Sequence, residues 1–457
     1  MNKSLIEKIL NKALENGGEF ADIFIEKKKS TLITSENNKI EKINTGEDNG
    51  IGLRLIKNGK TYYGYTNLVE EKDLLDLANI LSSSQISDSI LSKELIDENI
   101  INKSIIKDSP ENILLNKKTE LLKELNELSY SYDKRIRQVT LIYSDTFQDI
   151  IIANSNGKYS EDKRTRTRYF INLIAIDGNI IQTSFEGPGE TSGFELISKY
   201  KPKDIVKKAA DRVLLMLEAP YAPRGQMPVV LTSQAGGTMI HEACGHALEA
   251  DFIYKKTSVF TGKTNEQVSS PVITVIDDAT IPNLYGTFGC DDEGTPAQRT
   301  VLIENGILKN YMSDCYYADL LNIPKSGNGR RESYRQKPTP RMTNTFIEPK
   351  DKSPDEIISS VKNGLLVKKM GGGQVNITNG DFVFEVNEGY LVENGKIKHP
   401  VKGATLVGNG PEVLKSIDMI GNDIEFIPGT CGKYDHAPVS DGQPTLRIPE
   451  LIVGGQA

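Results

Sequence analysis

Two histidines five residues apart are the residues of this chain best suited to metal chemistry. The chain has only four histidines in 457 residues, and His241 and His246 share one short segment in which Glu242 follows the first. The surrounding residues are mostly apolar and compatible with a helix, which predicts a buried helix that carries imidazoles. Imidazoles beside a carboxylate are typical of zinc-dependent hydrolases.

The interval between the two histidines differs from that of the usual zinc-hydrolase helix. Histidines at i and i+4 lie about 40° apart around a helix that turns about 100° per residue, whereas an interval of five gives about 140°. Both rings could then reach one metal only if the helix is locally distorted. Gly245, directly before His246, would permit such a distortion. We therefore predict a π-bulge or a break at Ala243–Gly245.

A third ligand is needed, because catalytic zinc normally has three protein ligands and one open position. Cys431 lies in a glycine-flanked loop that is suited to presenting a side chain into a site. On spacing alone, Cys431 could be either a metal ligand or an inert core thiol. The other candidates are His399, His436, Glu249 and Asp251.

Other residues near these motifs have both a functional and a structural interpretation. Glu249, three residues after His246, could orient that ring by accepting a hydrogen bond from it, or could be a helix-surface carboxylate. Cys244 is interpreted as a small core residue rather than a fourth ligand. Arg330 and Arg331, in a glycine-rich loop, could bind a substrate carboxylate, stabilise an oxyanion or form structural ion pairs. Gly371–Gly373 leads into a strand-like segment without a following Lys-Ser/Thr, so we reject a phosphate loop.

Composition limits the class of protein. A chain of 457 residues with 38% hydrophobic and 26% charged residues is long enough for two domains. The net charge of −7 argues against a nucleic-acid partner. There is no apolar run that approaches a membrane span and no signal-peptide core. The four cysteines lack the paired spacing of a disulfide framework, so we expect a reduced, cytoplasmic protein.

The N-terminal half alternates between helical and strand patterns. An apolar stripe predicts a helix within residues 1–17, and the turn Asn58-Gly59-Lys60 predicts a β-hairpin. Helices are expected at Glu70–Ser84, Glu111–Tyr132 and Lys203–Glu218. Strands are expected at Ala21–Glu26, Gly50–Ile56, Thr61–Tyr65, Ile136–Ser144, Ile150–Ala153, Arg166–Ala175 and Ile180–Phe185.

The best domain boundary is the Pro- and Gly-containing segment Pro220–Gly225. After it, an apolar strand at Met227–Leu231 leads into the histidine motif, and the remaining chain is rich in short strands and glycine turns. A helix near Ser353–Val361 is the exception. We therefore expect an α+β fold: an N-terminal α+β domain over residues 1–220 with antiparallel strands, and a β-rich catalytic domain over residues 225–457.

Several segments of the C-terminal half resemble those of the TldD/PmbA family of metallopeptidases. The resemblance is dense over about residues 225–457 and looser over the N-terminal half. It points to the metal-bearing TldD side rather than to the PmbA-like partner, which lacks the histidine motif. The segments that carry it are His241–Phe252, Gly294–Arg299, Gly327–Ser333, Pro340–Thr345, Gly371–Gln374, Val401–Ala404, Pro428–Cys431 and Gly442–Thr445.

The resemblance implies one zinc ion per chain, held by His241, His246 and Cys431, with Glu242 polarising the attacking water. It also implies a dimer that encloses the active sites, either a homodimer or a heterodimer with a PmbA-like subunit, and small unfolded peptides as substrates. A His₂Cys set suits zinc and leaves one position open. The alternatives are a non-catalytic peptide-binding subunit, a zinc amidase acting on a small amide, and a regulator that binds a protein partner.

Overall fold

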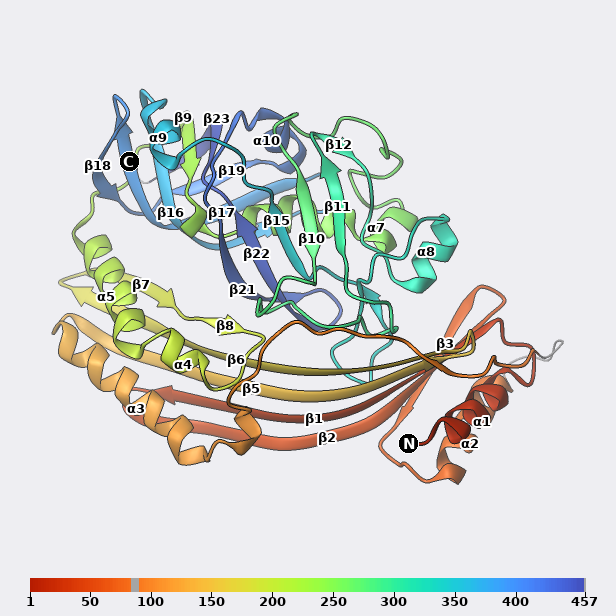
Figure 1. Cartoon of the computed structure of the whole chain (residues 1–457). Coiled ribbons are helices and arrows are strands. Elements are labelled where there is room, and N and C mark those ends of the chain that lie inside the picture. Colours follow the sequence, from red (N-terminus) through yellow and green to blue (C-terminus); the bar gives the residue numbers. More distant parts are fainter. Residues whose placement is uncertain (84–89, 456–457) are drawn as a thin grey trace.

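The computed structural model describes residues 1–83 and 90–455, and its chain forms two stacked halves (Figure 1). The N-terminal half is one long curved antiparallel sheet with helices at both of its ends. The C-terminal half is built mainly of short strands and lies against the concave face of that sheet (Figure 1). The expected α+β class, with antiparallel strands followed by a β-rich C-terminal region, is confirmed.

The N-terminal sheet has the order β3-β2-β1-β5-β6-β4, and β7 and β8 also pair with β6. The predicted hairpin at Asn58-Gly59 is present, and both residues adopt the positive φ values of a tight hairpin turn. The predicted strands are present but several are parts of longer ones. The strands are β1 Phe20–Glu36, β2 Lys39–Lys57, β3 Lys60–Thr66, β4 Ile96–Asp97, β5 Ile136–Asn154, β6 Lys158–Asp177, β7 Ile180–Glu186 and β8 Gly189–Glu190.

Helices pack on both ends of this sheet, each over its own apolar core. The helices α1 and α2 cover one end, and α3 and α5 cover the other (Figure 1). All four correspond to predicted helices, although Ser84, the expected last residue of α2, lies outside the described residues. The bounds are α1 Lys3–Leu14, α2 Glu71–Ser82, η1 Pro110–Asn112, α3 Leu115–Tyr132, α4 Leu196–Lys199 and α5 Pro202–Glu218.

The first sheet of the C-terminal half closes on itself. Strand β9 pairs with β16 and β23, and the path continues through β19 and β17 back to β16. The segment Gly371–Gly373 lies inside β16, so the expected strand after these glycines is wrong: Val375 ends the strand and a turn follows. The strands are β9 Gly225–Leu231, β16 Asn363–Val375, β17 Asp381–Glu393, β18 Lys396–Val401, β19 Thr405–Asn409, β20 Met419–Ile420 and β23 Leu446–Gly454.

A second sheet of the C-terminal half has the order β12-β11-β10-β15-β22-β21, which places β21 at its edge. A two-stranded pair, β13 with β14, lies outside both larger sheets. The strands are β10 Val275–Asp278, β11 Arg299–Glu304, β12 Ile307–Leu308, β13 Gly329–Arg330, β14 Thr339–Pro340, β15 Asn344–Ile347, β21 Glu425–Gly432 and β22 His436–Gln443.

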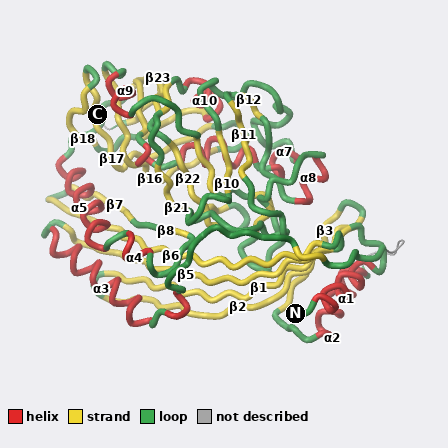
Figure 2. Tube along the Cα trace, viewed as in Figure 1, coloured by secondary structure: helices red, strands yellow, loops and turns green. Residues whose placement is uncertain are grey.

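Only short helices interrupt the strands of the C-terminal half (Figure 2). Most of the histidine motif is buried, and its apolar residues belong to the large core that both C-terminal sheets share. The helical segments are η2 Ser233–Ala235, α6 Thr238–Ile240, η3 His241–Gly245, η4 His246–Leu248, α7 Ala250–Tyr254, α8 Cys315–Leu321, α9 Pro354–Ser359 and α10 Gly410–Ser416. The expected helix near Ser353–Val361 is α9.

Buried ion pairs join the two halves. Arg54 of β2 pairs with Asp22 of β1 and with Glu293 of the C-terminal half, and all three side chains are at most 3% exposed. Arg164 of β6 pairs in the same way with Asp292, at 2.6 Å. Charges that are buried in this way are stable only when they are paired, so these contacts fix the C-terminal half on the sheet.

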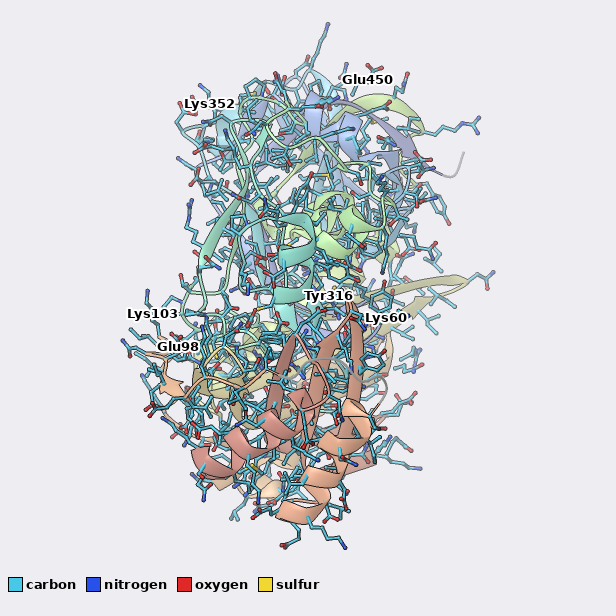
Figure 3. The ribbon with its side chains drawn as sticks, turned by 90° about the vertical axis from the view of Figure 1, so that its right-hand side faces the viewer. Lys60, Glu98, Lys103, Tyr316, Lys352 and Glu450 are labelled. Atoms are coloured by element: carbon cyan, nitrogen blue, oxygen red, sulfur yellow. The ribbon has the colours of Figure 1, made fainter. Side chains whose placement is uncertain are left out.

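A smaller contact closes the same junction near the β2–β3 hairpin. Tyr316 of α8 donates a hydrogen bond of 2.8 Å to the carbonyl of Gly59 at the hairpin turn. Figure 3 shows Tyr316 beside Lys60, at the level where the two halves meet. Within residues 1–83 and 90–455, no helix has both the length and the apolarity that crossing a bilayer requires.

Candidate metal centre

The histidine motif forms one turn of π-helix. After α6 ends at Ile240, the π turn η3 runs over His241–Gly245, and a 3₁₀ turn begins at His246. The backbone N–H of His246 donates to the carbonyl of His241, which is the i→i+5 hydrogen bond that defines a π turn. The wider turn brings the two rings together, with centroids 5.0 Å apart and planes at 89°. The predicted distortion at Ala243–Gly245 is therefore confirmed.

Gly245 has a different role from the one its sequence position suggested. Its φ of −55° and ψ of −60° are ordinary right-handed helical values, so the backbone does not need the conformational freedom of glycine. A Cβ atom at this position would instead collide with Sδ of Met342, which is fully buried. Glycine at this position leaves room for the side chain of Met342, which packs against the turn that carries the histidines.

Cys431 completes a cluster of three potential ligands. It lies on the edge strand β21, opposite Ala437 of β22, and its Sγ lies 3.3 Å from Nε2 of His246. One ligand atom from each of His241, His246 and Cys431 falls within 4.8 Å of the others, and all three residues are buried. Three converging N and S donors fit a tetrahedral metal that keeps a fourth position open.

Each histidine of the cluster contacts a carboxylate through its other ring nitrogen. Nδ1 of His241 lies 2.7 Å from Oδ1 of Asp441, and Nδ1 of His246 lies 3.1 Å from Oε2 of Glu249. The alternative that Glu249 is a helix-surface carboxylate is wrong, since the residue is completely buried. Such carboxylates fix the tautomer and the orientation of a ligating ring, with Nε2 turned toward the metal.

The three donors and the two carboxylates concentrate charge in a small buried volume. Burial disfavours the protonated form of both imidazoles, but Asp441 and Glu249 more than offset this effect, so the pKa of His241 rises well above its usual range and that of His246 rises to about 9. Burial also disfavours the thiolate, yet hydrogen bonds from both imidazoles lower the pKa of Cys431 to about 6. A thiolate beside imidazolium groups is a site whose protons a cation can replace.

Glu242 lies on the wall of a cavity of about 430 Å³ that the three ligands also line. The side chain is only partly buried, unlike those of Glu249 and the two histidines. Across the described ranges 1–83 and 90–455, no hydrogen bond or ion pair engages its carboxylate. The structure therefore presents one free carboxylate directly beside the ligand cluster.

Arg330 and Arg331 lie apart from this cavity, among the buried groups of the junction. Arg330 donates to the carbonyl of Met342 at 2.5 Å. Arg331 donates to the carbonyl of Asp292 at 2.8 Å and stacks over the ring of Phe24 at 4.4 Å. The side chains are engaged by protein groups, so the geometry favours the structural interpretation of this arginine pair over the substrate-binding one.

The remaining sequence candidates do not join the ligand cluster. Cys244 is fully buried in the shared apolar core, where burial raises the pKa of its thiol to about 12, and the interpretation as a core residue is confirmed. His399 and His436 are exposed, and neither lines the cavity. Asp441 was not among the sequence candidates. It lies 200 residues from His241, and no local pattern marks it.

Models of protein families match most of the chain. The PmbA/TldA metallopeptidase C-terminal domain matches residues 224–455, the central domain of the same family matches residues 108–217, and domain 1 matches residues 21–84. The longest match contains the histidines, the adjacent glutamate and the cysteine of the cluster. These matches define the class of the protein as a metallopeptidase.

Known relatives extend the match to nearly the whole chain. A metalloprotease TldD homologue from Haemophilus influenzae is 36% identical, covering 96% of this chain and 93% of that protein. A metalloprotease from Methanocaldococcus jannaschii is also 36% identical, with 98% of each chain covered. A zinc metalloprotease TldD homologue from Saccharolobus solfataricus is 29% identical over 98% of this chain and 99% of that protein. The chain belongs to the PmbA/TldD metallopeptidase family.

Solved structures agree with the fold. A protein from Thermotoga maritima superposes with a TM-score of 0.82 at 22% identity, covering 99% of each chain. TldE from Thermococcus kodakarensis gives a TM-score of 0.78 at 19% identity, covering 99% of this chain and 100% of that one. At these identities the likeness concerns the fold, and the activity rests on the metalloprotease relatives.

Proposed function

We propose that this chain is a zinc-dependent peptidase that holds one zinc ion through His241, His246 and Cys431. In this proposal Glu242 is the general base, and the substrates are small unfolded peptides. The metalloprotease relatives support the reaction class, and one of them is named a zinc metalloprotease. The metal, its ligands and the role of each residue are the parts that the proposal adds.

The chemistry of the donors supports zinc. Two imidazole nitrogens and one thiolate form a borderline-soft set that suits Zn²⁺ and excludes the hard cation Mg²⁺, which prefers oxygen ligands. The contacts of Asp441 and Glu249 engage Nδ1 of each ring and leave Nε2 for the metal. Because a thiolate donates more charge than a carboxylate or an imidazole, we expect a mild Lewis acid and slow turnover.

The free carboxylate of Glu242 is the single observation that carries the mechanism. Zinc, when bound, supplies a Lewis acid that polarises the scissile carbonyl. Glu242 lines the same cavity as the ligands and has no competing partner among the described residues, so it can accept the proton of the attacking water. The same carboxyl group then returns that proton to the leaving amine.

The edge strand β21 supports recognition of extended peptides. This strand ends the order of its sheet, and its residues Gly429–Gly432 line the cavity of the ligands. An extended peptide can add to a free strand edge through main-chain hydrogen bonds, which discriminate little between side chains. A folded protein cannot present its main chain in this way, so unfolded peptides are the expected substrates.

Two assemblies are compatible with the proposal: a homodimer and a heterodimer with a PmbA-like subunit. The rival function is a non-catalytic peptide-binding subunit, in which the cluster would hold no metal. The presence of all three ligands together with Glu242 argues against that rival.

The test measures bound metal and peptide cleavage on the wild type and on Glu242→Ala, alone and with a PmbA-like subunit added. The proposal expects about one zinc per chain in both proteins, because Glu242 is not a ligand, and cleavage only in the wild type. Loss of the general base lowers the rate by about 10²- to 10⁴-fold. A wild type that binds peptide without metal and without cleavage, even with the partner, would establish the binding-subunit function instead.

A further inference from the structure

The side chain of Lys433 is buried beside the carboxylate that contacts His246, one of the proposed metal ligands. Nζ of Lys433 lies 2.9 Å from Oε2 of Glu249 and 2.6 Å from Oδ1 of Asp251, and the lysine side chain is only 4% exposed. The oxygen of Glu249 that contacts Lys433 is the same atom that contacts Nδ1 of His246. One carboxylate oxygen therefore joins the ammonium group to the imidazole.

We propose that Lys433 is a positioning residue of the metal centre. Its ammonium group fixes the carboxylate of Glu249, and Glu249 in turn holds the ring of His246 with Nε2 toward the metal. This inference rests on the proposed function, because it requires that His246 is a metal ligand. It adds Lys433, which is not itself a ligand, as a residue whose positive charge affects how tightly the three ligands bind the metal.

The burial of Glu249 explains why a cation is needed. The residue is completely buried, and its second oxygen, Oε1, has no hydrogen-bond partner among the described residues. The nearby cation Arg341 donates elsewhere, to the carbonyl of Cys431 at 2.7 Å and to Asp435. Because an uncompensated buried charge is strongly unfavourable, the contact with Lys433, which is the ammonium group that reaches Glu249, compensates this carboxylate and holds it in place beside His246.

The carboxylate that contacts His241 lies in a different environment from the one that contacts His246. The carboxylate of Asp441, which orients His241, is 15% exposed and lines the cavity. Solvent can stabilise this anion, and across residues 1–83 and 90–455 no lysine or arginine forms an ion pair with it. Lys433 thus contacts Glu249, the carboxylate that solvent does not reach, and not Asp441, which solvent does reach.

One short segment of the chain carries both Cys431 and Lys433. Lys433 follows Cys431 by two residues, in the turn between β21 and β22, where its backbone N–H donates to the carbonyl of Asp435. Its Nζ also donates to the carbonyl of Pro340 at 3.2 Å and lies 4.4 Å from the ring centroid of Phe252. The ammonium group is held from several sides, as a positioning role requires.

Lys255 provides a matched control. It contacts the same Asp251, through the other carboxylate oxygen at 3.4 Å, but its side chain is 44% exposed and does not reach Glu249. Lys255→Met and Lys433→Met each remove an ammonium group from Asp251. Only Lys433→Met also removes the cation from Glu249.

The experiment measures the affinity for Zn²⁺ and Co²⁺ by competition with a chromophoric chelator at fixed pH. Lys433→Met is expected to weaken binding by about 10- to 100-fold, as losses of groups behind a ligand do. Lys255→Met is expected to change it by less than about fivefold. The thiolate-to-cobalt absorption band should keep its position in Lys433→Met, because the inferred effect acts through His246 and not through Cys431.

A double variant separates charge compensation from general damage. In Glu249→Gln the neutral amide still accepts from His246 and needs no cation, so adding Lys433→Met should then change the metal affinity by less than about twofold. If Lys433→Met alone does not fold, the variant that combines it with Glu249→Gln and Asp251→Asn, which leaves neither buried anion that Lys433 contacts, must fold and bind metal like Glu249→Gln. An unfolded combined variant, or equal losses from Lys433→Met with and without Glu249→Gln, would overturn the inference.

The outcomes also distinguish the inference from the proposed function. A wild type that binds neither metal would contradict the metal centre itself, and with it this inference. A wild type that binds metal, together with a Lys433→Met variant that binds as well as Lys255→Met, would overturn only the role of Lys433.

Discussion

Oδ1 of Asp441 lies 2.7 Å from Nδ1 of His241, although 200 residues separate the two in the chain. The contact joins the π turn η3 to strand β22, the direct neighbour of the strand that carries Cys431. The same pair of strands therefore supplies a potential ligand and the group that orients another ligand. This arrangement makes the cluster sensitive to Asp441 as well as to the ligands themselves.

Asp441→Ala is expected to weaken zinc binding by about 10- to 100-fold, because the ring of His241 loses the acceptor that fixes its tautomer. Chelator competition at fixed pH measures the change. Asp418→Ala, which removes a carboxylate from a surface pair with Arg447, is the control and should bind as the wild type does. Unchanged affinity in Asp441→Ala would mean that His241 is oriented by something else.

Gly245→Ala is expected to destabilise the chain by about 1–3 kcal/mol and to weaken metal binding, since the new methyl group meets Met342 and the π turn must shift. Urea unfolding and zinc titration measure the two effects. Gly46→Ala, where a Cβ meets no atom within 4 Å, is the matched control. If shortening Met342 to Ala in the Gly245→Ala background does not recover metal binding, the collision is not the cause.

Asp291 predicts a pH dependence of stability. Burial and the neighbouring Glu293 raise the pKa of Asp291 from 3.8 to about 7, even though backbone N–H groups of Glu293, Thr295 and Gly329 donate to its carboxylate. The folded pKa lies above the unfolded one, so the stabilising contribution of this group is complete below about pH 4 and is lost as the pH rises through about 7.

Asp291→Asn removes this titration. Between about pH 5 and about pH 8, the variant should lose less unfolding free energy than the wild type does, as measured by urea unfolding at both pH values. Asp48→Asn, at a surface pair with Arg335, should keep the wild-type dependence, because Asp48 stays ionised over that range. Parallel pH profiles for the wild type and Asp291→Asn would contradict the shifted pKa.

Arg331→Met tests the two interpretations of the arginine pair. Removal of one buried charge from the network with Asp22 and Asp292 should lower the unfolding free energy by about 3–5 kcal/mol. The KM of the folded fraction for a peptide should not change, because Arg331 does not line the cavity of the ligands. A raised KM with wild-type stability would restore the substrate-binding interpretation.

The local features of the fold could be predicted because they depend on residues that are close together in the sequence. The stripe of α1 and the turn at Asn58-Gly59 each follow from a few consecutive positions. The five-residue interval between His241 and His246 even predicted the π turn, since a regular helix would place the two rings too far apart around its axis. The geometry within one segment can therefore be predicted from the spacing of its residues.

The lengths of the long strands were not accessible, because pairing partners decide them. β1 continues through the polar run Lys27–Ser30, which has no alternation of apolar residues, and β2 on one side and β5 on the other hydrogen-bond that run. The sequence predicts alternation over Ala21–Glu26 and a solvated strand end at Lys27–Lys29, whereas β1 continues to Glu36. The lysine side chains remain outside the core, so their sequence does not show how far the strand continues beyond them.

The groups that support the site could not be predicted either, because their contacts also depend on residues that are distant in the chain. Asp441 contacts His241 and Lys433 contacts Glu249, in both cases far apart in the chain, and a lone carboxylate or lysine carries no signal of such a contact. Glu249 was accessible as a candidate because it lies three residues from His246. The division of the chain into domains at Pro220–Gly225 stays a prediction.

X-ray absorption at the zinc edge of the loaded protein tests the central claim most directly, because it counts the donors around the metal. The proposed centre should show one sulfur at about 2.3 Å and nitrogen or oxygen donors at about 2.0–2.1 Å. In Cys431→Ser the sulfur contribution should disappear. A wild-type spectrum without sulfur, or one that Cys431→Ser leaves unchanged, would contradict the assignment of His241, His246 and Cys431 as the metal centre.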